Sequence, residues 1–172
     1  PVSYQTIRQI SMCQYELGNY TESIQAMKQL LHPFPNNIEL IYSIAIINLD
    51  KLENPEEALL YFTFGKDRFS DKMSSIYGHN FKLIMDPTVA PDIYYDLFYG
   101  RARTNMILQH YKEAASDCNW AIYLRPQQGE PYKIRAKANV QLNRFGSICS
   151  DIRQAKKLGV ADIADLERKY CR

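Results

Sequence analysis

The sequence predicts an all-α fold built from pairs of antiparallel helices that repeat along the chain. Residues 95–158 contain one segment written twice, 34 residues apart and without a gap. The positions that match between the two copies are Phe98 and Tyr132, Arg101 and Arg135, Ala102 and Ala136, Leu108 and Leu142, Tyr111 and Phe145, Asp117 and Asp151, Ala121 and Ala155, and Leu124 and Leu158. Helical spacing inside a period of this length is typical of stacked helical hairpins.

Each copy is expected to hold two helices joined by a tight turn. In the first copy, the second helix has an apolar stripe at helical spacing, formed by Tyr111, Ala114, Ala115, Cys118, Ala121 and Ile122. Gln109 and His110 form the turn before it, and Pro126 ends it because proline cannot continue a helix. In the second copy, helices are expected over 132–142 and 145–158, followed by Gly159 as a left-handed terminator.

Two further copies are expected in the N-terminal half, at about 3–35 and 38–70, beside those at about 95–126 and 129–158. The spacing from Ala58 to Ala114 is 56, which exceeds one period by 22. Residues 71–91 are therefore an insertion: a bridging helix that Ser70 caps, a degenerate repeat or a partner-binding loop. The whole chain, 1–172, is predicted to be a single domain.

The repeated segments resemble tetratricopeptide repeats. The positions that carry this resemblance are aromatic Phe98, Tyr132, Tyr111 and Phe145, small Ala114, Ala121 and Ala155, and Pro126 in the linker. Cys118, Ile148 and Ile152 depart from the family pattern. The resemblance implies a right-handed α-solenoid, and a last helix at about 161–172 would cap it through Ile163, Leu166 and Tyr170. The C-terminal segment, from Cys149 on, is also similar to the tails of small bacterial tetratricopeptide proteins.

Composition indicates an ordinary globular chain, with 46% hydrophobic and 23% charged residues. The net charge is −3 over residues 1–86 (7 basic against 10 acidic) and +5 over 87–172 (14 against 9). The cysteines Cys13, Cys118, Cys149 and Cys171 have no zinc-site spacing, so we expect mostly core thiols, a free Cys171 and no disulfide scaffold. No membrane span is expected; the location would be cytoplasmic, or periplasmic if a leader preceded Pro1.

The candidate binding residues lie on the first helices of the two C-terminal copies, whose free faces would line a concave groove. They are Tyr99, Arg103, Lys133 and Lys137, which could present cations to an acidic peptide or protein segment. A solvated groove wall without a ligand is the alternative for these side chains. No motif for catalysis, a metal or a cofactor is found, and the three histidines are scattered. Trp120 either packs on the next repeat or is an exposed anchor.

The sequence therefore predicts a non-catalytic interaction module that acts as a scaffold or adaptor. A self-assembling structural component, stacked through its N-terminal edge as a homo-oligomer, is the alternative. Nucleic-acid binding by the basic half is disfavoured, because acidic residues interrupt the positive charge and no base-stacking motif accompanies it.

Overall fold

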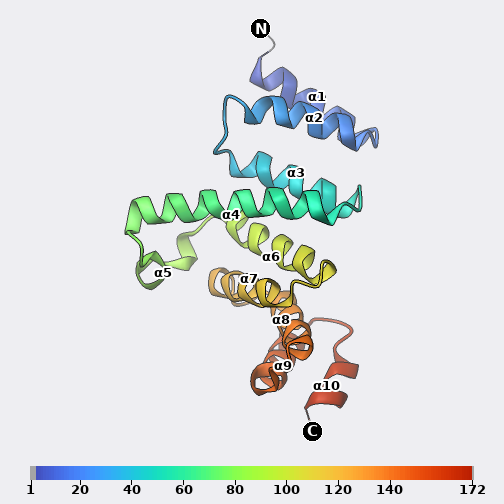
Figure 1. The fold of residues 1–172 in the computed structure, drawn as a ribbon, viewed down its shortest axis with the longest axis vertical. Helices are drawn as coiled ribbons and strands as arrows, with labels where there is room; N and C mark the ends of the chain where they lie inside the picture. Colours follow the sequence, from blue (N-terminus) through green and yellow to red (C-terminus); the bar gives the residue numbers. More distant parts are fainter. Residues whose placement is uncertain (1–2, 172) are drawn as a thin grey trace. The chain divides into compact units, whose positions relative to one another are not determined.

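The structure is a computed structural model that describes residues 3–171, and within this range it contains helices and no strand. The predicted all-α class is therefore confirmed (Figure 1). The chain forms two compact units, 1–72 and 73–172. The helices of the first are α1 (Tyr4–Glu16), α2 (Tyr20–Leu31), α3 (Ile38–Asp50) and α4 (Pro55–Tyr77), which runs past the division. The elements after α4 are α5 (Phe81–Ile84), η1 (Pro87–Val89), α6 (Asp92–Ile107), α7 (Tyr111–Leu124), α8 (Glu130–Gln141), η2 (Phe145–Ser147), α9 (Ile148–Lys157) and α10 (Ala164–Tyr170).

In the first unit, α1 and α2 form an antiparallel hairpin, and α2 also packs against α3. Ser3 caps α1 by accepting a hydrogen bond from the amide of Thr6, and Asn37 caps α3 through the amide of Leu40. Ser11 and Ser23 face each other where α1 and α2 cross, with their hydroxyl oxygens 3.1 Å apart. Small side chains at this crossing allow the two helix backbones to approach closely. A core of Ile24, Ile44 and Ile47 joins α2 to α3.

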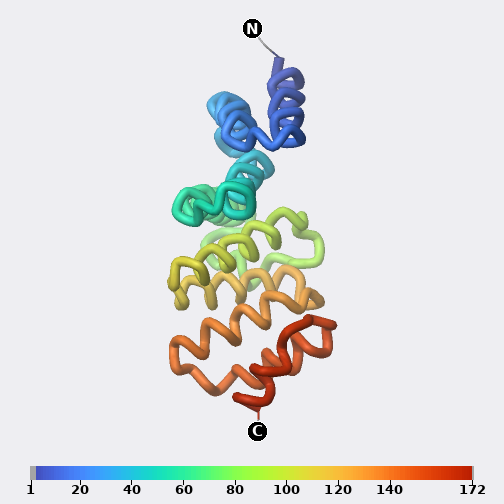
Figure 2. The backbone as a smooth tube through the Cα atoms, turned by 90° about the vertical axis from the view of Figure 1, so that its right-hand side faces the viewer, coloured from blue at the N-terminus to red at the C-terminus, as the bar shows by residue number. Residues whose placement is uncertain are grey.

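In the second unit, each of α6, α7, α8 and α9 packs on the helix that follows it, as Figure 2 shows from yellow to red. Buried alanines let these helices approach each other: Ala114, Ala115 and Ala138 form one cluster between α7 and α8. The last cluster contains Ile148, Ile152 and Ile163. Each hairpin therefore gains its buried surface from its neighbours, as expected for helical repeats.

A residue with positive φ ends the first helix of each hairpin. Gly18, Glu53, Gln109 and Asn143 occupy this position, with φ of 80°, 50°, 61° and 55°. At Gln109, the next amide, that of His110, donates to the carbonyl of Asn105 at 2.8 Å. This bond closes a Schellman-type helix end and turns the chain into α7.

The insertion differs from its expected form. One of the three expected forms was a separate bridging helix capped by Ser70, but α4 continues through Ser70 to Tyr77. No proline or glycine interrupts residues 66–77, and Gly78, with φ of 80°, then ends the helix. The short helix α5 and the 3₁₀ turn η1 follow, so residues 86–91 contain one helical turn.

Two C-terminal boundaries also differ. The helix expected from Phe145 starts as the 3₁₀ turn η2, because Gly146 and Ser147 are weak helix formers, and α9 begins at Ile148. The cap begins at Ala164 rather than 161, since Asp162 has a φ of 56°, which is incompatible with a helix interior. Ile163, Leu166 and Tyr170 pack on the last hairpin as predicted. The final residue of the predicted cap, at 172, lies outside the described range.

Candidate functional site

Helical spacing assigns all four predicted binding residues to the surface that α6 and α8 form in the second unit, which we call the α6–α8 face. Helices α6 and α8 contact each other directly. Side chains spaced at three or four residues on each helix define the face: Tyr95, Tyr99, Arg103 and Met106 on α6, and Lys133, Lys137 and Gln141 on α8. The face therefore combines aromatic and cationic side chains at neighbouring positions.

Tyr99 and Arg103 are brought together on α6. The ring of Tyr99 stacks on Tyr95 with 5.7 Å between centroids, and the guanidinium carbon of Arg103 lies 5.9 Å from the centre of the Tyr99 ring. Both side chains are half-buried. Stacking of this kind holds an arginine in a defined orientation.

The two predicted lysines of α8 differ in their surroundings. The ammonium of Lys133 donates to the carbonyl of Ala161 at 3.1 Å and lies 3.9 Å from Glu130, and only 15% of its side chain is exposed. Lys137, one turn further on, is exposed and has no ion pair or hydrogen bond with any residue in 3–171. Lys133 therefore anchors the loop before α10, and Lys137 is the lysine of this pair that can meet a ligand.

Burial raises the pKa values of two side chains at the α6 end of this face. It raises the pKa of the Tyr95 phenol well above its ordinary value, and the neighbouring Tyr99 and the charge of Asp96 act in the same direction. The pKa of Asp96 is itself raised, chiefly by burial and then by Asp92, while Arg125 opposes the shift. Tyr95 therefore presents a neutral hydroxyl group at physiological pH.

Two buried ion pairs, which sequence reasoning did not identify, recur at the 34-residue period. Nε and Nη2 of Arg101 donate to both oxygens of Asp117 at 2.5 to 3.0 Å, and the Asn105 amide donates to the same carboxylate at 2.9 Å. One repeat later, Arg135 donates to Asp151 at 2.9 and 2.6 Å. The hydrogen bond with Asp151 is the main factor that raises the pKa of Arg135.

These pairs join the two helices of each C-terminal hairpin and leave little charge for a ligand. Asp117 and Asp151 are 1% and 3% exposed. The signal that could have found them was in the sequence, because both members recur with a separation of 16 and each acid lies on a stripe that is otherwise apolar. Cys118, beside the first pair, is also structural: burial raises the pKa of its thiol far above its usual value, so it stays protonated.

Trp120 packs on α5 of the insertion and on α6, a contact that neither alternative for this residue had named. Its indole stacks on Phe81 of α5 and on Phe98 of α6, with centroid distances of 5.7 and 5.4 Å. The ammonium of Lys82 lies 4.5 Å from the indole centre. One turn on, the hydroxyl of Tyr123 donates to the carbonyl of Met85 at 2.6 Å. The α5–η1 segment is thus fixed to the end of α7.

Arg125 completes this attachment. Its guanidinium donates to Asp92 at 2.7 Å and to the carbonyl of Pro87 at 3.0 Å, and it also donates to the carbonyl of Ala90. One arginine therefore joins the end of α7 to η1, to the residue that follows η1 and to the first residue of α6.

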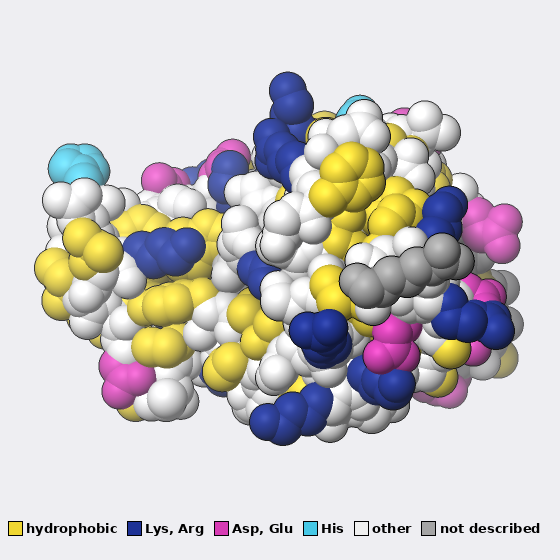
Figure 3. Space-filling model, turned by 90° about the horizontal axis from the view of Figure 1, so that it is seen from below, with side chains coloured by type: hydrophobic (Ala, Val, Ile, Leu, Met, Phe, Trp, Pro, Cys, Tyr) yellow, Lys and Arg dark blue, Asp and Glu magenta, His cyan; other side chains and the backbone are white. Residues whose placement is uncertain are grey.

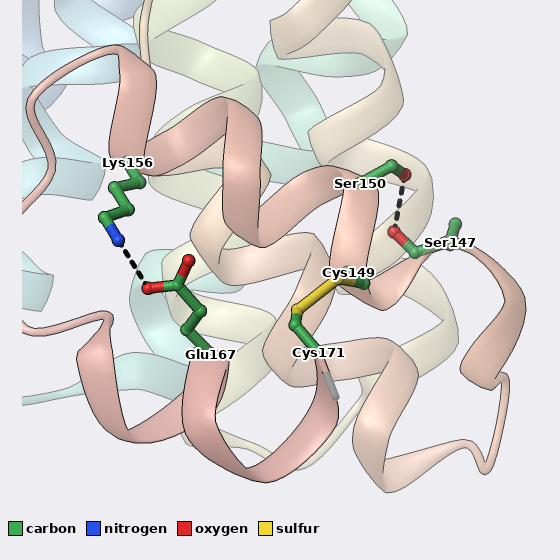
Figure 4. Close-up of a disulfide and its surroundings, with 6 residues drawn as sticks. All are labelled: Ser147, Cys149, Ser150, Lys156, Glu167 and Cys171. Atoms are coloured by element: carbon green, nitrogen blue, oxygen red, sulfur yellow. Dashed lines mark hydrogen bonds and ion pairs between the residues drawn. A yellow bond between two sulfur atoms is a disulfide. The ribbon is translucent and has the colours of Figure 1, made fainter.

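A disulfide between Cys149 and Cys171 corrects the prediction of a free Cys171. Cys149 lies in α9 and Cys171 directly follows α10, and their Cα atoms are 5.1 Å apart (Figure 4). The two residues are separated by 22 positions and come together because α10 folds back on α9. No local spacing motif predicts such a bond, since the fold alone creates the proximity.

A pocket of about 380 Å³ opens where α10 meets the α6–α8 face. Lys137, Val140 and Gln141 of α8 form one side of it, and Leu166 and Tyr170 of α10 lie among the residues of the other. Its volume is within the range of about 300 to 1,000 Å³ that is usual for ligand sites. The pocket contains one of the four predicted binding residues.

No group of three or more metal-ligating side chains occurs within residues 3–171. Among the helices described, none combines the length and the hydrophobicity that crossing a membrane requires. The surface seen from the C-terminal end carries Lys and Arg side chains interspersed with Asp and Glu (Figure 3). A mixed surface of this kind differs from the continuous basic patch of a nucleic-acid interface.

Comparison with known proteins identifies the fold and goes no further. No protein-family model matches the chain, and no curated sequence is significantly similar to it. Among solved structures, that of the MamA protein superposes with a TM-score of 0.69 at 14% identity, covering 90% of this chain and 72% of MamA. The structure of TTC0263, a thermophilic TPR protein of Thermus thermophilus, superposes with a TM-score of 0.40 at 17% identity, covering 98% of this chain and 97% of TTC0263. The chain thus has a tetratricopeptide-like helical-repeat fold.

Proposed function

We propose that this protein is a non-catalytic interaction module whose α6–α8 face binds an acidic segment of a partner protein. The observation that carries the proposal is the environment of Lys137, which is exposed on this face, lines the pocket and has no partner within 3–171. Arg103, oriented by Tyr99, supplies a second cation on the same face. Together they favour carboxylates over neutral or basic segments.

The buried polar groups of the C-terminal hairpins support a binding role over a catalytic one. The carboxylates of Asp117 and Asp151 are fully engaged with arginines inside the hairpins, and Cys118 is held as a thiol. An active site needs titratable groups that reach a substrate, and these groups do not reach the surface.

The proposed partner is tested by affinity capture from the source cell, with the Lys137→Glu variant compared with Lys112→Glu. Lys112 is an exposed lysine of α7 outside the pocket, so both variants change the net charge equally. Recovery of the specific partner should fall at least fivefold with Lys137→Glu and stay unchanged with Lys112→Glu. Equal recovery by both variants would remove the α6–α8 face from the proposal.

The disulfide also favours one of the two expected compartments. Structural disulfides form and persist in oxidising compartments, whereas cytosolic thiols are kept reduced. We therefore infer that the protein works in an oxidising compartment such as the periplasm. Mass spectrometry of the protein, alkylated in intact source cells before lysis, should find Cys149 and Cys171 linked; alkylation of both thiols would contradict this location.

A further inference from the structure

The pocket between α8 and α10 has an apolar interior. Met106 of α6, Tyr111 of α7 and Val140 of α8 line it, together with Leu166 and Tyr170 of α10, and all five side chains are half-buried. Met106 and Tyr111 also pack on the cluster of small alanines between α7 and α8. An apolar side chain of a ligand that entered the pocket would be removed from water together with the apolar lining. This burial of apolar surface is the main favourable contribution to such binding.

The charged groups around this interior are mainly cationic. Lys137 reaches the pocket from α8 and Lys169 from α10, where its ammonium lies 5.2 Å from the ring centre of Tyr170. Asp165 is the acid among the lining residues, and it pairs with Arg168. An occupant with carboxylates beside an apolar group therefore complements both the interior and the rim.

The α10 side of the pocket is held in place before any ligand arrives. The Cys149–Cys171 bond fixes the end of α10, and the Lys156 ammonium pairs with Glu167 at 2.6 Å (Figure 4). On the other side of α10, Lys133 holds the preceding loop through the carbonyl of Ala161. A pocket that is already formed avoids much of the ordering cost that binding otherwise carries.

We propose that this pocket binds one leucine-sized apolar side chain of an acidic partner segment, with Lys137 and Lys169 pairing with the flanking carboxylates. The proposal rests on the proposed function and narrows it to one apolar residue between acidic neighbours. It also gives the disulfide a role in binding, since Leu166 and Tyr170 reach the pocket from the helix that the bond secures.

The test measures fluorescence polarisation of the full chain with the labelled peptide Glu-Glu-Leu-Glu-Glu at low ionic strength. We expect saturable binding, about tenfold weaker binding when the central leucine is replaced by alanine, and no measurable binding of Lys-Lys-Leu-Lys-Lys. Gln141→Trp fills the pocket from an exposed position and should weaken binding at least tenfold. Gln127→Trp, an equal change at an exposed site outside the pocket, should have no effect.

The outcomes separate this proposal from the more general one. If the leucine peptide does not bind, binds no better than the alanine peptide, or binds Gln141→Trp as well as the wild-type chain, the pocket is not the site. A capture experiment that still depends on Lys137 would then leave the general proposal standing. Cys171→Ser should weaken binding of the leucine peptide about threefold or more, because α10 is then less firmly held. Unchanged affinity would overturn the role of the disulfide in binding.

Discussion

At the scale of single residues, the turn between α6 and α7 contains an avoidable strain. Gln109 occupies the left-handed region with φ of 61°, where the equivalent residue of the first hairpin is Gly18. Side chains with a Cβ are disfavoured in this region by about 1 to 2 kcal/mol, of which part is offset by the greater unfolded-state entropy of glycine.

Gln109→Gly should therefore raise the free energy of unfolding by about 0.5 to 1 kcal/mol in a urea titration. The control is Ser116→Gly at an exposed position inside α7, which should lower it by about 0.5 kcal/mol. Destabilisation by both changes would show that the turn at Gln109 is not left-handed.

The Arg101–Asp117 pair makes a second prediction at this scale. Asp117→Asn removes the charge that compensates a largely buried guanidinium, so the free energy of unfolding should fall by about 3 to 5 kcal/mol. The matched change Asp165→Asn breaks the exposed pair with Arg168 and should stay within about 0.5 kcal/mol of the wild type. Similar losses from the two changes in chemical denaturation would refute the structural role of the buried pair.

At the scale of elements, α10 depends on its covalent link. In the chain-entropy description, closing a loop of about 22 residues stabilises the folded state by about 3 kcal/mol. Cys171→Ser should lower the stability of the second unit by about this amount, measured by chemical denaturation without reductant. Cys13→Ser, at an exposed free thiol, should leave it unchanged. A Cys171→Ser protein as stable as the wild type would mean that the bond adds nothing to the cap.

The α5–η1 segment depends on the aromatic contacts of Trp120. Trp120→Ala removes the stacking on Phe81 and Phe98 and should expose the backbone after Lys82 to trypsin, with cleavage there at least fivefold faster. Trp120→Phe keeps an aromatic ring and should stay close to the wild-type rate. The cleavage rates are measured by mass spectrometry. Equal rates for the wild type and both variants would show that the indole does not hold the segment.

Periodicity predicted the hairpins well because the information for them is local. Apolar residues at helical spacing and the turn at Gln109 define α6 and α7 without reference to the rest of the chain. The helix start considered at Ser70 was wrong, because a residue that can cap a helix is also tolerated inside one. No proline or glycine between Ser70 and Gly78 ends the helix earlier. Contacts distant in sequence, such as Cys149 with Cys171, follow from packing and have no signature in spacing.

The candidate site was predictable to a lesser extent. Helical spacing placed Tyr99, Arg103, Lys133 and Lys137 on one face, but it could not show that Lys133 is engaged by the carbonyl of Ala161. Nor could it reveal the pocket, because α10 forms one side of it and the position of a short helix depends on tertiary contacts. The Arg–Asp pairs could have been predicted from the sequence, since charged residues that recur on a buried stripe require partners.

At the scale of the whole molecule, the division between the two compact units, after Lys72, falls inside α4. We propose on this ground that residues 1–172 behave as the single domain that the sequence predicts. In a helical repeat, each hairpin is stabilised mainly by its neighbours, so a shared helix couples the units. Coincident denaturation curves for fluorescence of Trp120 and for total helix content would agree with this proposal, and two separate transitions would oppose it.

The central claim is that binding takes place at the α6–α8 face and the adjoining α10. The most direct test is amide hydrogen exchange of the full chain with and without the captured partner. We predict added protection in α6, α8 and α10, with the strongest effect around Val140 to Leu142 and Leu166 to Tyr170. Added protection confined to residues 4–50, with α6, α8 and α10 exchanging as in the free protein, would contradict the claim.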